Sequence, residues 1–309
     1  MTLGIDVLAA VLSRLQGILV TVSIVTMMAA MGTRMTPGDV RRTTREYNLV
    51  SRWVLANLVV VPLFAVFFSA VFGIGESILL GLLLVAVAPG APFIPQLVAL
   101  AGEDSQEAVR FTAALTVVAT VTVPLLVAGA LAVLDAETGF SPWRFLLPLL
   151  LVLVVPLVIG LAVRARWPAA GARVGPRLFA LSNAALLAAL VIVVVLDTGA
   201  MLRALAVLFG TGALLVIALF VLVTIGIGWL AGSPDPKSRR ILALGTAGRN
   251  VNVALFIAVT AFPERNADAS IVVFAVLMFA VSVGVALYWQ RHPRSGATTA
   301  GGNVPDGPP

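Results

Sequence analysis

The sequence has no cysteine, a single lysine, a single histidine and few charged residues of either sign. Without cysteine the chain has no disulfides, thiolate metal sites or thiol chemistry. His292 stands beside Arg291 in a polar C-terminal stretch, so we expect a solvated tail residue and not a ligand. Charged residues are 11% of the 309 and hydrophobic residues are 60%, whereas soluble domains carry about 25% charged residues. The surplus apolar surface is therefore expected to face a lipid bilayer.

Nine apolar stretches are long enough to cross a membrane as helices, which takes roughly 20 residues each. The sequence therefore predicts an all-α membrane protein with about nine transmembrane helices. The five tryptophans, Trp53 among them, lie at or just beyond the ends of these stretches, where membrane interfaces are expected. The stretches run over residues 9–32, 49–73, 78–101, 107–134, 143–163, 176–196, 202–231, 239–262 and 268–289.

Lysine and arginine are distributed unequally between the two predicted sides of the membrane. Fifteen of the 20 fall on one side, whereas only Arg144, Arg203 and Arg265 fall on the other. The positive-inside rule makes the first side cytoplasmic. This predicts an inner (plasma) membrane protein with its N-terminus outside and a disordered cytoplasmic tail over 290–309. The basic residues form no continuous patch, which argues against a nucleic-acid partner.

Prolines and a glycine interrupt the predicted helix over 78–101 at its middle. Pro89, Gly90, Pro92 and Pro95 fall within seven residues. Each proline removes a backbone donor and clashes with the preceding turn, so a continuous helix through this run is not expected. Unpaired backbone groups at membrane depth occur only where protein or a watery cavity satisfies them. The sequence therefore predicts a broken helix here, and not a simple kink.

A second interruption is predicted in the stretch 239–262, whose middle combines glycines with polar side chains. Small residues alone would indicate only close helix packing. An arginine near the bilayer centre is much more costly and is functional by default. The residues concerned are Gly245, Thr246, Gly248, Arg249, Asn250 and Asn252.

The two interrupted stretches lie five stretches apart and therefore cross the membrane in opposite directions. This is the parity expected of inverted repeats whose discontinuous helices cross at a substrate site. Nine stretches leave one five-helix repeat a helix short, and the missing helix would be the first. The N-termini of the half-helices would direct a positive dipole end toward an anion at the crossing.

Motifs along the chain occur in a recognisable order. Residues 31–42 read MGTRMTPGDVRR, residues 88–104 read APGAPFIPQLVALAGED, and residues 245–258 read GTAGRNVNVALFIA. The spacing of Asn57 and Pro62 and the PLL at 124–126 complete the pattern. Across nearly the whole chain this pattern resembles the bile acid:sodium symporter superfamily, whose members without the first helix have nine spans.

The resemblance implies a fold of two domains and a transport function. The panel domain would be residues 1–46 and 143–197, and the core domain with the crossover helices would be 49–134 and 202–289. The family carries an organic anion with sodium by alternating access.

The resemblance also implies a sodium site, but most of its matching positions carry other residues here. A family glutamate and glutamine in the second crossover fall on Thr246 and Asn250, and a serine–asparagine pair in the first falls on Ile94 and Pro95. Asn57 matches a family glutamine. All 14 acidic residues lie in loops, tails or span ends, so a sodium site would use neutral oxygens alone. No cofactor or bound metal is expected.

Thr112, Thr116 and Thr120 lie on one helix face at intervals of four residues. Thr116 and Thr120 approximate hydroxyl ligands of the family. Threonines in membrane helices also bond their own i−4 carbonyls, and that interpretation is the alternative.

We hypothesise that Arg249 supplies the fixed positive charge that bound sodium supplies in relatives. It would hold the crossover together or pair with an anionic substrate; alternatively, it points to a water-filled vestibule and tunes the local potential. Asn57, Asn250 and Asn252 would contact substrate or close the unwound backbone, and Gln96 is a further candidate for substrate contact. Ser182 and Asn183 would form a gate or an interhelical bond.

The leading hypothesis is a secondary transporter of a small organic anion. A passive channel and an auxin-efflux-like carrier are alternatives. An intramembrane enzyme would need a metal, a Ser/Lys or Ser/His pair or paired carboxylates at depth, and the sequence offers none of them. An arsenite exporter is disfavoured by the lack of cysteine. The oligomeric state is left open.

Overall fold

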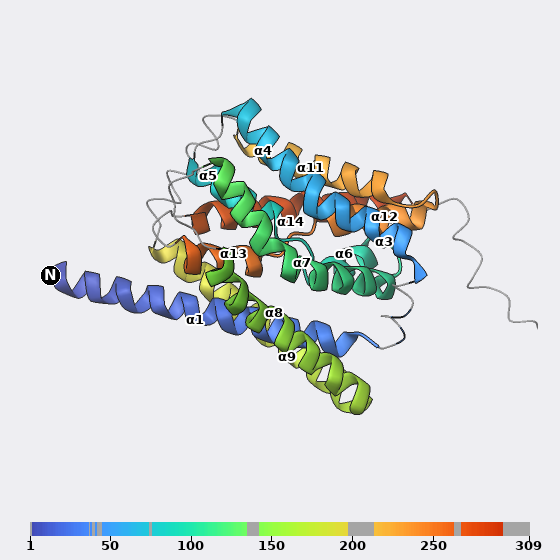
Figure 1. Cartoon of the computed structure of the whole chain (residues 1–309), viewed down its shortest axis with the longest axis horizontal. Helices are drawn as coiled ribbons and strands as arrows, with labels where there is room; N and C mark the ends of the chain where they lie inside the picture. The colour runs from blue at the N-terminus through green and yellow to red at the C-terminus, as the bar shows by residue number, and fades with distance from the viewer. Residues whose placement is uncertain are drawn as a thin grey trace, which may run out of the picture.

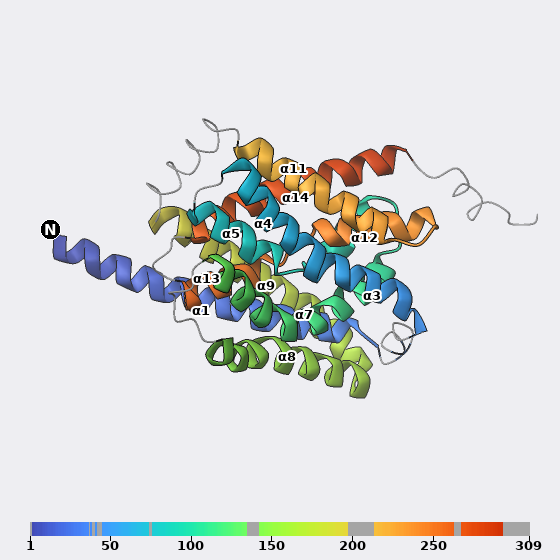
Figure 2. The same ribbon diagram turned by 45° about the horizontal axis from the view of Figure 1, so that its top comes forward.

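The computed structural model of the chain describes residues 2–36, 38, 41, 45–73, 76–134, 142–196, 213–262 and 267–292. Their regular elements are helices, and the only β-pairing among them is one isolated bridge. Most helices run along the long axis of the molecule (Figures 1 and 2). Within the described residues, five helices are long and apolar enough to cross a membrane: Ala10–Arg34, Tyr47–Phe72, Pro168–Val195, Leu214–Ala231 and Ala267–Arg291.

Large apolar side chains cover the outer surface of the described helices. Leu215 is 76% exposed and Leu230 is 81% exposed, and both belong to α11 (Ala213–Ala231). In water such a surface would cause aggregation, whereas in a bilayer it is the solvated surface. The structure therefore agrees with an all-α protein that lies in the membrane.

Three helices form one group: α1 (Thr2–Arg34), α8 (Pro142–Arg166) and α9 (Pro168–Leu196). Helix α1 packs against both of the others, and the three lie together at one side of the molecule (Figure 2). The backbones of α1 and α8 touch at Gly32 and Gly160, where neither helix has a side chain to separate them. Small residues permit this close approach in membrane proteins, because dispersion contacts then replace lipid contacts. We call these helices the three-helix group.

The other helices form a second group around two short pairs of helices, and we call it the crossing group. A large cluster of buried apolar side chains connects its members. The group consists of α3 (Tyr47–Leu55), the π-helical η1 (Ala56–Val60), α4 (Val61–Phe72), α5 (Glu76–Ala86), α6 (Ile94–Leu100), α7 (Ser105–Leu134), α11, α12 (Pro236–Ala247), α13 (Val251–Ala261) and α14 (Ala267–Arg291).

Both predicted helix interruptions are present. Helix α5 ends at Ala86 and α6 begins at Ile94, and α12 ends at Ala247 and α13 begins at Val251. The predictions for two residues were wrong, because both lie inside helices and not in the breaks. Pro95 belongs to the first turn of α6, where its missing N–H would have no partner within the helix. Gly245 lies inside α12, where its lack of a side chain makes room for the indole of Trp53.

The π-helical turn between α3 and α4 was not predicted from the sequence. Pro62 has no N–H to bond the carbonyl of Leu58, so the helix widens before it, and Val61 bonds Ala56 instead. π-turns of this kind often occur at functional sites. Here the turn contains Asn57, which is fully buried.

The basic loops gather at one end of the molecule, which we call the basic end. There α1 and α8 end, and α9 and α12 begin (right side of Figure 1). Trp53 was predicted at a membrane interface, but it is 1% exposed in the interior. The first part of the predicted stretch 202–231, Arg203, Arg265 and the tail beyond His292 lie outside the described residues.

Candidate functional site

The two helix interruptions lie side by side and satisfy each other's backbone. Pro89 and Arg249 form an antiparallel β-bridge. The amide of Asn250 donates to the carbonyl of Ala88 at 2.7 Å, and the amide of Ala91 donates to the carbonyl of Gly248 at 3.3 Å. Groups that each broken helix leaves unpaired thus find partners in the other segment, as the membrane interior requires. We call this region the crossing.

Asn250 and Gly90 fix the crossing from opposite sides. Gly90 has φ +88°, and a Cβ there would lie 2.7 Å from the hydroxyl of Thr116, so only glycine fits. Asn250 caps α13 by accepting the amide of Val253 at 3.2 Å. Its Nδ2 donates to the carbonyl of Gly90 at 3.5 Å. Asn250 therefore closes the unwound backbone, which is one of its two predicted roles.

Arg249 is fully buried beside the crossing. Its Nη1 donates to the carbonyl of Ala86, the last residue of α5, at 3.2 Å. Its backbone amide points to the sulfur of Met278 in α14 at 3.2 Å. Its Nε and Nη2 are buried without a hydrogen-bond partner among the described residues. The guanidinium thus caps the negative end of a half-helix and leaves one edge of its fork unused.

Thr246 lies at the centre of a second polar cluster, between α12 and the π-turn. Its hydroxyl accepts the indole N–H of Trp53 at 2.8 Å and the Nδ2 of Asn57 at 3.1 Å. Asn57 also donates to the carbonyl of Trp53 at 2.9 Å. Trp53 is the residue that sequence reasoning missed, because a tryptophan near a span end is typical of an interface.

Asn252 contacts the three-helix group and not the crossing. The hydroxyl of Ser23 in α1 donates to its Oδ1 at 2.5 Å, and its Nδ2 points to the sulfur of Met27 at 3.2 Å. Ser23 also bonds Ser182 in α9, at 3.2 Å between the hydroxyls. Ser182 therefore makes an interhelical bond, which is the simpler of its two predicted roles.

The remaining predicted residues lie at the edge of the site or outside it. Thr116 donates to the carbonyl of Thr112 at 2.8 Å, which is the i−4 bond of the alternative interpretation. The side chain of Thr120 falls outside the described residues. Gln96 is exposed, and its amide nitrogen fits best against the carbonyls of Pro92 and Phe93 in its own turn.

A cavity of about 360 Å³ lies at the basic end, between the three-helix group and α7. Arg34 and Arg164 line it from the three-helix group, and Gln106 and Val109 line it from α7. Arg34 stacks over the ring of Phe179 at 4.6 Å, which holds its charge in place. Polar and apolar groups share the lining, and the two arginines give it a positive charge.

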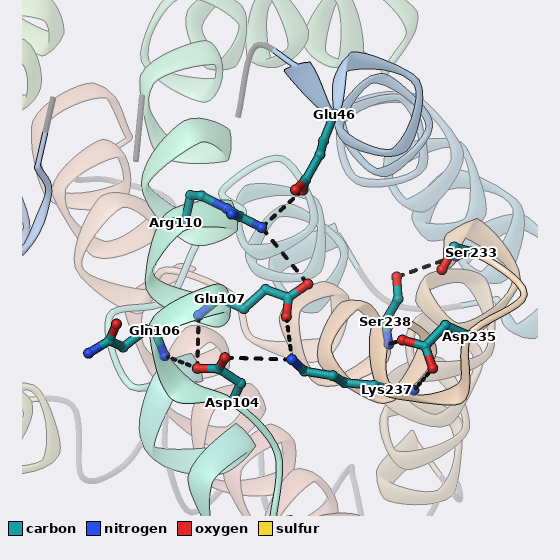
Figure 3. A network of polar contacts seen from close by, with 9 residues as sticks. All are labelled: Glu46, Asp104, Gln106, Glu107, Arg110, Ser233, Asp235, Lys237 and Ser238. Carbon is teal, nitrogen blue, oxygen red and sulfur yellow. Dashed lines mark hydrogen bonds and ion pairs between the residues drawn. The ribbon is translucent and has the colours of Figure 1, made fainter. Parts of the chain in front are cut away.

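Ion pairs connect the helices of the crossing group at the basic end (Figure 3). Lys237 at the start of α12 pairs with Glu107 at 2.9 Å and Asp104 at 3.5 Å. Glu107 also faces Arg110 at 3.9 Å, and Arg110 pairs with Glu46 before α3 at 2.9 Å. The network ties α3, α7 and α12 together on the side where α6 ends and α12 begins.

A comparison with protein-family models matches residues 21–204 to the sodium bile acid symporter family. The chain belongs to this family. The match covers the first helix break but ends before Gly248–Asn250. The pairing of the first break with the second is therefore known only from the structure. No curated protein matches the chain at a significant level. Membership makes the chain a multi-pass membrane protein of a transporter family, and the family's own description mentions sodium and bile acid.

Removal of Lys237 tests the ion-pair network of this family member. The bond with Glu107 raises the pKa of Lys237 above its ordinary 10.5, against the opposing effect of burial. Burial alone would raise the pKa of Asp104, but amides of Glu107 and Gln106 and the charge of Lys237 lower it below 3.8 overall. The raised lysine pKa stabilises the folded protein at pH values below 10.5, and the lowered aspartate pKa stabilises it at pH values above 3.8.

We therefore expect Lys237→Gln to lower the unfolding temperature by a small and constant amount from about pH 5 to pH 9. The loss corresponds to about 1 kcal/mol, because the pairs are partly exposed. Thermal unfolding of the detergent-solubilised protein across this range measures it. Arg166→Gln, which removes an exposed charge, serves as the control and should have almost no effect. A loss that varies strongly within this window would show that other groups control it.

Proposed function

We propose that this protein is a secondary transporter that carries a small organic anion across the membrane by alternating access. Paired broken helices at a central crossing support this proposal most directly, because such helices form the substrate sites of many transporters. The crossing contains a buried cation, Arg249, and the N-terminus of α13. Both favour a negatively charged substrate. Nine spans arranged as inverted repeats would place the crossing near the bilayer midplane.

We infer that the two helix groups are the panel and core domains that the sequence predicts. The three-helix group, tightened at Gly32 and Gly160, would be the panel. The helices around the crossing would form the core. Polar contacts between the groups include Ser23–Asn252 at mid-depth and Gln16–Asp268, at 3.2 Å, toward the end opposite the basic end. Relative motion of the groups would need to break these polar contacts and to move the apolar side chains of α1 and α8 past those of α7 and α13.

The cavity supports a conformation that opens toward the cytoplasm. It lies between the two groups at the basic end, which the positive-inside rule makes cytoplasmic. Arg34 and Arg164 give it a positive potential, which raises the local concentration of an anion. Gln16 and Asp268 would close the opposite, external side in this conformation.

Uptake into proteoliposomes tests the proposal, with a panel of carboxylates and sterol-like anions. We expect saturable uptake of at least one anion. The chain has no cysteine, so Gln16→Cys/Asp268→Cys can be joined specifically by a short, reducible bis-thiosulfonate reagent. Cross-linking should lower uptake at least about tenfold, since the external side can no longer open, and a reductant should restore it.

The single variant Gln16→Cys, treated with the same reagent, is the matched control and should transport normally. Full uptake by the cross-linked double variant would contradict alternating access between the two groups. Flux that does not saturate with anion concentration would indicate a passive channel instead.

A further inference from the structure

We propose that the guanidinium of Arg249 is a fixed cation that takes the place of a co-transported sodium ion, so that this protein carries its anion without sodium. This proposal rests on the proposed transport function and adds which ion gradient does, and does not, drive it. It also departs from the family description, in which sodium is named.

The position of the guanidinium disfavours a sodium ion at the end of α5. In transporters with broken helices, sodium is coordinated by unwound carbonyls and by the C-terminal ends of half-helices. Here the C-terminal carbonyl of α5, that of Ala86, accepts a hydrogen bond from Nη1 of Arg249. The protein's own cation thus occupies the negative end of this half-helix. A second cation nearby would be repelled in a poorly screened interior.

The polar cluster around Thr246 lacks the chemistry of a sodium site. A sodium ion needs oxygen atoms whose lone pairs converge on one point. The hydroxyl of Thr246 instead receives two N–H groups, from Trp53 and Asn57. The Trp53 ring also fills the space beside Gly245, where a Cβ would come within 2.7 Å of it. N–H groups therefore point at the oxygen that would have to bind sodium, and an indole ring fills the space that the ion would need.

Few side-chain oxygens remain at the crossing to bind a sodium ion. The side chain of Ile94 packs against Gly248 at the crossing and offers no ligand. Asn250 uses its Oδ1 to cap α13. Asn57 Oδ1 and the hydroxyls of Thr112 and Ser282 are buried without a hydrogen-bond partner among the described residues. These three neutral side-chain oxygens are too few to replace the hydration shell of an ion beside a guanidinium. The residues present do not fit sodium.

The two unpaired nitrogens of Arg249 indicate which group would neutralise the substrate in place of sodium. Nε and Nη2 lie on the same side of the guanidinium, and this pair of N–H groups matches a carboxylate in a bidentate geometry. The fixed cation would therefore satisfy α5 on one side and an organic carboxylate on the other. It stays in the protein, so only the charge of the anion crosses the membrane in a full cycle.

The expected lack of sodium binding is tested on the purified protein, without any substrate. Thermal unfolding is followed as NaCl replaces choline chloride at constant ionic strength. We expect midpoints that agree within about 1 °C. Sodium at ten times its Kd would raise the midpoint by about 3 °C through binding to the folded state. A saturable, sodium-specific rise of that size would overturn the proposal.

The membrane potential tests how transport is energetically coupled. Proteoliposomes are given one monoanion that they take up from the set of carboxylates and sterol-like anions. An inside-positive potential, set with potassium and valinomycin, should raise accumulation by about 50-fold per 100 mV, equally with sodium or choline outside. Stimulation by an inside-negative potential, or by sodium, would show symport and overturn the proposal. If no anion enters under any condition, the proposed function fails, whereas the unfolding experiment still decides whether sodium binds.

Two variants assign the effect to Arg249. Arg249→Lys keeps the charge, and Arg249→Gln keeps an N–H donor for the carbonyl of Ala86 but not the charge. We expect the lysine variant to retain sodium-independent uptake at a level at least about tenfold above that of the glutamine variant. Equal uptake by the two variants would show that a fixed positive charge is not required.

Discussion

Replacement of Arg249 by methionine is expected to abolish anion uptake while the protein stays at least as stable as the wild type. The guanidinium is fully buried, and two of its nitrogens have no partner among the described residues. Taking such an ion out of water costs several kcal/mol. Methionine fills a similar volume without this cost and loses one charge-assisted hydrogen bond, worth about 1.5–3 kcal/mol. Stability alone would therefore favour an apolar residue, and a functional requirement explains the arginine.

Uptake should fall at least about 100-fold, the loss typical of removing one partner of a buried charge pair. Thermal unfolding and proteoliposome uptake on the same preparation separate the two effects. Arg14→Met, which removes an exposed charge from α1, is the control and should change neither quantity. A variant that unfolds easily, but whose folded fraction transports normally, would give Arg249 a purely structural role.

Addition of one methyl group at Gly32 is expected to destabilise the protein, whereas the same change at Gly17 is not. Both glycines lie in α1. A Cβ at Gly32 would overlap the backbone of α8 at Leu157 and Leu161, and neither helix can yield without separating from the other. A Cβ at Gly17 meets nothing within 4 Å. Gly32→Ala should cost about 1–3 kcal/mol as overpacking, and Gly17→Ala should gain about 0.5–1 kcal/mol from helix propensity.

Thermal unfolding of the two alanine variants, measured side by side, checks this prediction. Because the chemical change is the same in both, differences in hydrophobicity and helix propensity cancel in the comparison. Equal stability of the two variants would mean that α1 and α8 are not in backbone contact in the membrane protein.

Local chemistry explains why the helix breaks could be predicted from the sequence. Single prolines such as Pro156 lie inside a continuous helix, but Pro89, Gly90 and Pro92 together remove two backbone donors within one turn, which a helix does not tolerate. Arg249 marks a functional position because a charge at that depth is costly in any arrangement. The structure pairs the two breaks through the bridge of Pro89 and Arg249. Sequence parity was consistent with this pairing but did not specify which residues meet.

The errors concern residues whose role depends on a neighbouring helix. Trp53 was expected at an interface, yet its indole donates to Thr246, 193 residues away in the chain. Asn252 was assigned to the crossing, yet it contacts Ser23 and Met27 in α1. Gly245 was interpreted as a helix break, yet it makes room for a ring. Side chains of the same type behave differently in each setting, so spacing alone could not assign them.

The amino-acid sequence by itself determined that this protein is helical, lies in a membrane and breaks two of its helices around a buried arginine. These properties follow from hydropathy, proline geometry and the cost of burying charge, all of which act within one segment. Only the tertiary structure decided which groups meet at the crossing. It placed a guanidinium on the carbonyl end of α5 and two N–H donors on Thr246. Those contacts depend on how distant helices pack, and they are the basis for expecting transport without sodium.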